Sequence, residues 1–187
     1  ISVSHYRLSI HLFIAFSILS SLFWILLNSL NKSNKIFFQF NRNNIVLKFL
    51  LIFLFIQIIL GAFVSGLDAG KVYQTWPLMN GSYFPDDTTI KNLFNLNLPS
   101  AVQFLHRNIA YLIFFIFLYF VFNVLKKKES HLYVNLLILF LVILIQILLG
   151  IFVLLTGANI YLASMHQISS IFLVVATLKL YHLSINT

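Results

Sequence analysis

Residues 136–155 read LLILFLVILIQILLGIFVLL, and this run of side chains decides the fold class. An α-helix rises about 1.5 Å per residue, so about 20 apolar residues are enough to cross the roughly 30 Å of hydrocarbon in a bilayer. The strands of a membrane barrel would instead alternate apolar and polar residues over about ten positions. Here every side of the segment is apolar, and Gln146 is the exception. The run therefore predicts a transmembrane helix.

Four further segments have the same length and character. Together with the first run, they place membrane spans at about 7–30, 45–66, 101–125, 132–156 and 160–182. The chain of 187 residues is 60% hydrophobic and only 9% charged, which leaves too little polar surface for a soluble domain. The sequence therefore predicts an all-α integral membrane bundle of five helices.

Basic residues in the short connections predict how this bundle is oriented. The connection after the first span carries Lys32, Lys35 and Arg42 with no acidic residue, and residues 126–129 read KKKE. Lysine and arginine in short loops stay on the cytoplasmic or matrix side of the membrane. The long loop 67–100 is then expected on the outer side.

Net charge and cysteine content exclude several other classes of protein. The net charge of +8 comes from short loops rather than from one basic face, so membrane topology and contact with anionic lipid explain it and no nucleic-acid partner is expected. The chain has no cysteine, which excludes disulfides and thiolate-bound metal clusters. Histidine is then the obvious strong metal ligand.

Three of the six histidines lie early in different predicted spans, namely His11, His106 and His166. An ionisable side chain inside hydrocarbon is costly, so such a residue suggests a ligand or a proton relay. His106 and His166 follow the expected helix starts by about 5 and 6 residues, which puts both roughly 8 to 9 Å below the outer boundary. The alternative is a buried histidine that only hydrogen-bonds a neighbouring helix. The remaining histidines are expected to be solvated, at interfaces or in loops: His5, His131 and His182.

The sequence also contains an internal repeat. Residues 57–64 read QIILGAFV and residues 146–153 read QILLGIFV, and each segment precedes a loop and a helix with an early histidine. Residues 45–187 are therefore expected to form a four-helix bundle from two copies of one hairpin. Residues 1–44 would supply a linker and the last helix of a preceding bundle, as expected for the C-terminal part of a longer protein.

A pair of imidazoles on facing helices can hold a haem iron from both sides. Zinc is a weaker fit, because a closed zinc site needs four ligands and a catalytic one usually three. Arg107 lies beside His106 at the water interface, where it either orients its helix or pairs with a haem propionate. At about 35 residues, loop 67–100 is longer than most structural connections, which favours a functional lid over the histidines.

Four stretches together resemble the haem A synthase family of the proteobacterial and mitochondrial type. They are GLDAGKVYQTWPLMNG at 66–81, VQFLHRNIAYL at 102–112, MHQ at 165–167 and YRLSIHL at 6–12. The resemblance covers essentially the whole chain, as the fourth to eighth helices of an eight-helix protein. The absence of cysteine is similar to the cysteine-free members of the family.

This resemblance implies an enzyme that converts haem O to haem A for cytochrome c oxidase by oxidising a ring methyl to a formyl group. It implies a haem B cofactor between His106 and His166 in residues 45–187. It also implies that His11 is one of two histidines that bind the substrate haem O. The family's first three helices, with the other histidine and a glutamate, are not in this sequence, so we expect the chain alone to be inactive.

The resemblance further implies a multi-pass protein of the bacterial or mitochondrial inner membrane, with its histidine sites near the outer side. Haem O is expected to come from a haem O synthase, while the electron-transfer partner, the source of oxygen and a homo-oligomeric state stay open. The alternative is a membrane b-type cytochrome that only transfers electrons, although its histidines would commonly lie on both sides of the membrane. A transporter is disfavoured because its helices would break at mid-membrane, whereas the prolines all fall in loop 67–100: Pro77, Pro85 and Pro99.

Overall fold

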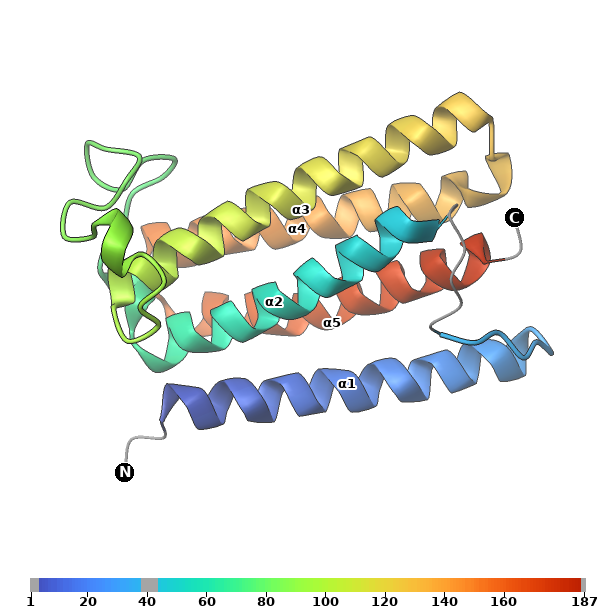
Figure 1. Ribbon diagram of the computed structural model, residues 1–187, viewed down its shortest axis with the longest axis horizontal. Helices are drawn as coiled ribbons and strands as arrows, with labels where there is room; N and C mark the ends of the chain where they lie inside the picture. The colour runs from blue at the N-terminus through green and yellow to red at the C-terminus, as the bar shows by residue number, and fades with distance from the viewer. Residues whose placement is uncertain (1–3, 38–43, 186–187) are drawn as a thin grey trace.

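A computed structural model describes residues 4–37 and 44–185, and long helices dominate this part of the chain (Figure 1). The five long helices of the described residues are α1 His5–Leu30, α2 Ile45–Gly66, α3 Pro99–Lys127, α4 Tyr133–Leu155 and α5 Ile160–Ser184. All are long and apolar enough to cross a membrane. The all-α membrane bundle is thus confirmed, and the expected boundaries are right to within two residues.

Local chemistry explains where several of these helices begin and end. Pro99 was expected in the loop but is the first residue of α3, a position that suits its fixed φ and missing N–H. The Asn159 side chain caps α5 by accepting from the backbone N–H groups of Tyr161 and Leu162, at 3.0 and 3.4 Å. Lys128 ends α3 in the left-handed conformation, with φ 54°.

The helices form two hairpins and one flanking helix. α2 packs against α3, and α4 packs against α5. The hairpins meet chiefly through α2 and α5, whereas α3 and α4 touch over fewer residues. Helix α1 lies alongside α2 and α5, outside the other four helices (Figure 1).

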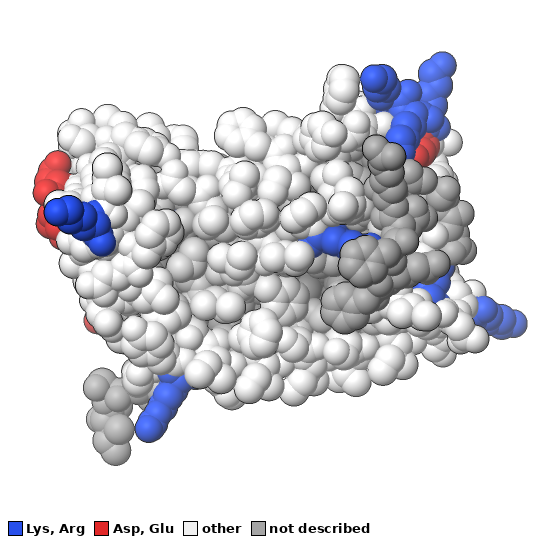
Figure 2. Space-filling view, in the orientation of Figure 1, with Lys and Arg blue, Asp and Glu red and all other residues white. Residues whose placement is uncertain are grey.

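Charged side chains mark the two ends of the bundle. We call the end that carries residues 67–98 the loop end, and the opposite end, with residues 126–132, the basic end. Figure 2 shows most of the visible charged side chains at these ends, with a broad uncharged band between them. This distribution suits a protein that crosses a bilayer several times. Arg42, one of the basic residues expected on the inner side, lies outside the described residues.

The main apolar core fills only the half of the bundle nearest the basic end. Its buried members on α2 come no later than Ile58, and those on α3 begin at Ile113. On α4 they end at Ile143, and on α5 they begin at Leu173. His106 and His166 therefore lie in the half nearest the loop end, beyond this core.

His182 was expected to be solvated, and this expectation is wrong. The residue is only 1% exposed, because α5 runs on to Ser184 and α1 packs over its last turns. His182 Nε2 lies 3.0 Å from Asn28 Oδ1 on α1, and Lys35 Nζ donates to the His182 carbonyl oxygen at 2.6 Å. These contacts fasten α1 and the residues after it to the end of α5.

Replacing this histidine should loosen the attachment of α1. His182→Ala removes the ring partner of the half-buried Asn28 side chain, so we expect the free energy of unfolding in detergent micelles to fall by roughly 0.5–1.5 kcal/mol. The matched control is His131→Ala, since His131 is exposed and its removal should change stability by less than about 0.5 kcal/mol. Equal stabilities of the two variants would show that His182 does not stabilise the attachment of α1.

Candidate functional site

His106 and His166 lie at matching depths on parallel helices. His106 follows Pro99, the first residue of α3, by seven positions, and His166 follows Ile160, the first residue of α5, by six. Both helices run from the loop end towards the basic end (Figure 1). The structure therefore places the predicted pair at one level of the bundle.

Gln57 and Gly61 of the neighbouring helix α2 form the site that holds His106, and we call such a site a histidine seat. The amide Nε2 of Gln57 donates to the His106 carbonyl oxygen at 3.0 Å and lies 3.2 Å from the ring Nε2. Gly61 is one helical turn further along α2, and a Cβ added there would lie 3.3 Å from His106 Cε1. The glutamine thus holds the ring by a polar contact, and the glycine leaves room for it.

His166 sits in a seat of the same design on α4. Gln146 Nε2 donates to the His166 carbonyl oxygen at 3.1 Å and lies 3.4 Å from the ring Nε2. A Cβ added to Gly150 would come within 3.1 Å of His166 Cε1, tighter than almost all real Cβ contacts. The internal repeat therefore gives two equivalent histidine seats.

Both seats leave buried polar atoms without partners. Among the residues that the structure describes, His106 Nδ1, His166 Nδ1 and Gln57 Oε1 have no hydrogen-bond partner. A buried polar atom left in this way costs about 1–3 kcal/mol, so each one needs an explanation. An imidazole that binds a metal uses one ring nitrogen for the metal and the other for a hydrogen bond. The two seats therefore have the donor set for a metal held from two sides, which fits a haem iron.

A closed site for a free metal ion finds less support. Within residues 4–37 and 44–185, no three His, Cys, Asp or Glu side chains gather in a group that could hold a metal ion. Structural zinc sites almost always use four such ligands.

Arg107 fastens the long loop over the start of α3. Its guanidinium donates to the carbonyl oxygens of Tyr73 and Leu78, at 3.1 and 3.4 Å. Gln103, one turn earlier, donates to the same Tyr73 oxygen at 2.9 Å. Burial, together with the hydrogen bond to Asp87 and the charge of that residue, raises the pKa of Tyr73 above its ordinary value, so the phenol keeps the proton it donates. Neither interpretation of Arg107 from the sequence anticipated its contact with the loop.

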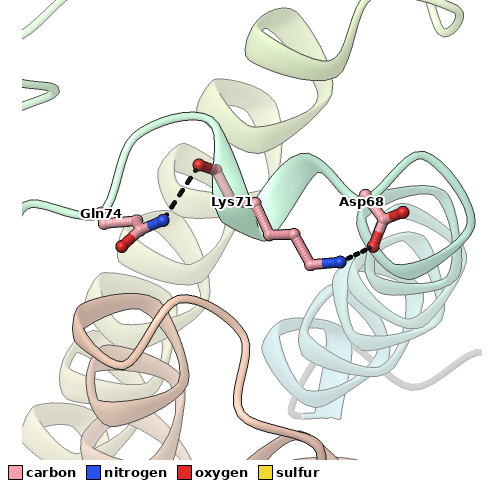
Figure 3. Close-up of polar contacts among 3 residues, drawn as sticks. All are labelled: Asp68, Lys71 and Gln74. Carbon is pink, nitrogen blue, oxygen red and sulfur yellow. Dashed lines mark hydrogen bonds and ion pairs between the residues drawn. The ribbon is translucent and has the colours of Figure 1, made fainter.

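The first part of the loop reaches the other hairpin. Lys71 forms an ion pair with Asp68 at 2.7 Å, and Gln74 donates to the Lys71 carbonyl oxygen at 3.2 Å (Figure 3). A Cβ added to Gly157, in the turn between α4 and α5, would lie 3.2 Å from Gln74 Oε1. The loop therefore contacts both hairpins at the loop end, as a cover over the two seats would.

His11 lies apart from this pair. It is exposed on α1, on a helix face that also exposes the large apolar residues Ile10, Ile14 and Ile18. It is near the loop end, like His106 and His166, but it points away from the four-helix unit. The structure thus places two of the three predicted histidines in equivalent surroundings at one level of the bundle, and it leaves the third on the surface of α1.

The residues that form the two seats were not predicted from the sequence. Gln57, Gly61, Gln146 and Gly150 belong to the repeat, yet the repeat was used only to pair the hairpins. The available signal was the shared spacing of glutamine and glycine by four positions, which places both on one helix face.

The sequence matches a family model described as cytochrome oxidase assembly protein, COX15-CtaA, over residues 1–178. The chain belongs to this family. A heme A synthase of Pelagibacter ubique is 45% identical over 172 residues, which are 90% of this chain and 50% of that protein. One of Flavobacterium johnsoniae is 37% identical over 194 residues, covering 97% of this chain and 55% of the relative. The chain spans about half the length of these relatives, and the family assignment agrees with the resemblance seen in the sequence.

Removal of the arginine should free the loop of this COX15-CtaA family member. Arg107→Leu deletes two hydrogen bonds to loop carbonyls, so we expect backbone amides in residues 72–80 to exchange hydrogen about 10- to 100-fold faster. The control is Lys91→Leu, at an exposed position of the same loop. Unchanged exchange in Arg107→Leu would show that other contacts hold the loop.

Proposed function

We propose that this chain is the part of a haem A synthase that holds a haem B between His106 and His166. The observation that carries the proposal is the pair of equivalent seats, each with a buried imidazole nitrogen that lacks a partner. The relatives are named heme A synthase. We propose for the whole protein the reaction that the family resemblance implies, the conversion of haem O to haem A.

The residues of the chain have distinct tasks in this proposal. His106 and His166 bind the iron, and Gln57 and Gln146 hold the two rings in place. The loop fastened by Arg107 limits the access of water to the seats. A haem with two imidazole ligands has no open coordination position, so it supplies electron transfer rather than oxygen binding.

His11 is proposed as a ligand of the substrate haem O. Its exposed position on α1 and the apolar residues around it suit a second helical unit that packs there and supplies the rest of the substrate site. Two haems near the same end of the bundle would be suitably placed for electron transfer between them. By the positive-inside rule the basic end faces the cytoplasm or matrix, which puts the histidines near the outer surface.

A b-type cytochrome that only transfers electrons would need the same pair of seats. Two observations favour the synthase. The three candidate ligands lie towards one end of the helices: His11, His106 and His166. Electron transfer across a membrane would need sites near both surfaces. The two relatives described above are both named heme A synthase.

The haem ligands can be tested directly. His106→Ala and His166→Ala each remove one of two iron ligands, so we expect the chain, purified from membranes with haem supplied, to lose its low-spin b-type spectrum. His131→Ala should keep that spectrum, because His131 is exposed near the basic end. The ligand assignment is wrong if either site variant retains a full complement of low-spin haem.

The reaction itself needs a separate test. The chain is joined to the part of the Pelagibacter ubique relative that it does not cover, and haem A is measured by pigment extraction from cells that make haem O. We expect haem A in the parent protein. His11→Ala should lower haem A at least tenfold, since one substrate ligand is lost, while the low-spin haem B stays. A parent protein that carries haem B but never forms haem A would favour the electron-transfer cytochrome.

A further inference from the structure

The two histidine seats differ at one position. In the α4–α5 hairpin, Ser169 Oγ donates to Gln146 Oε1. Ser169 follows His166 by three positions, and the residue three positions after His106 is Ile109. Ile109 has no hydroxyl group, and Gln57 Oε1 is buried with no partner within residues 4–37 and 44–185. One glutamine is therefore held at its oxygen and the other is not.

This difference decides which amide can turn. Gln146 is fixed at both ends, because its Nε2 donates to the His166 carbonyl oxygen at 3.1 Å and its Oε1 accepts from Ser169. Gln57 is fixed only through Nε2, which donates to the His106 carbonyl oxygen at 3.0 Å. A turn of the Gln57 amide exchanges that bond for one between Oε1 and a ring N–H of His106. The same turn at Gln146 would also break the bond from Ser169.

We propose that Gln57 sets the reduction potential of the iron bound by His106, and that Ser169 prevents Gln146 from doing the same at His166. If His106 Nδ1, which has no partner among the described residues, binds iron, Nε2 would carry the N–H. A turn of the Gln57 amide would bring Oε1 to the place of Gln57 Nε2, which lies 3.2 Å from that ring nitrogen. Gln57 is thus a positioning residue that acts through the imidazole. This inference rests on the proposed haem B site.

The direction of the effect follows from the basicity of the ligand. An acceptor on the free N–H makes an imidazole more electron-rich, and a more basic ligand stabilises ferric over ferrous iron. Gln57 Oε1 should therefore lower the midpoint potential. Adding a hydroxyl that occupies this oxygen should raise the potential, and removing the hydroxyl that occupies Gln146 Oε1 should lower it.

Two single substitutions give each hairpin the hydrogen-bonding pattern of the other. Ile109→Ser places a hydroxyl where the other hairpin has one, and Ser169→Ala removes it. The midpoint potential of the haem-loaded chain is measured by redox titration of its visible absorption band. We expect Ile109→Ser to raise the potential and Ser169→Ala to lower it, while both keep the full haem content.

Two further variants separate this effect from a loss of packing. Ile109→Ala removes the same apolar bulk without adding a hydroxyl, so its potential should stay near that of the parent chain. Gln57→Leu removes the acceptor, so its potential should rise as in Ile109→Ser. Gln57→Leu also serves if Ile109→Ser fails to fold.

The results distinguish this inference from the proposed function. A chain that binds no haem would overturn both. A haem-loaded chain whose potential is unmoved by Ile109→Ser and Ser169→Ala, or moves in the same direction in both, would overturn the role of Gln57 alone. Opposite shifts, with Ile109→Ala near the parent value, would support it.

Discussion

The organisation of this protein depends on the imidazoles of His106 and His166. Both lie inside membrane-crossing helices, so their polar partners must come from the protein itself. Lipid offers no hydrogen bonds, and a polar group buried without one is costly. In each hairpin, a glutamine of the neighbouring helix contacts the histidine ring, and a glycine leaves room for it. Gln57 and Gly61 serve His106, and Gln146 serves His166 from the same place in the second hairpin. The repeated hairpin is in this sense a repeated way to hold a histidine.

The main apolar core and the long loop lie on either side of the level that holds the two histidines. The main cluster of buried apolar side chains extends from the middle of the bundle to the basic end, between limits such as Ile58 on α2 and Leu173 on α5. That core fixes the helices, so the seats need no apolar core of their own. At the loop end, Arg107 and Gln103 hold the long loop through backbone carbonyls. The apolar core and the loop held by Arg107 thus lie on the two sides of the level at which the two histidines sit.

Equivalent seats need not have equivalent chemistry. Ser169 and Ile109 hold the same place in the two hairpins, yet only the serine can occupy a glutamine oxygen. A repeat that keeps its backbone geometry can in this way give each of its two ligands a different hydrogen bond. Such a difference acts on the electronic state of a bound metal without changing its ligands.

The sequence by itself determined the five spans, their ends to within two residues and the matched depth of His106 and His166. Those features depend on local hydrophobicity and on helical rise, which each segment carries alone. Only the tertiary structure decided that His182 is buried beneath α1, that Arg107 holds the loop and that Gln57 and Gln146 reach the rings. These contacts join residues far apart in the chain, and their existence depends on which faces of the helices meet, a property that no single segment encodes.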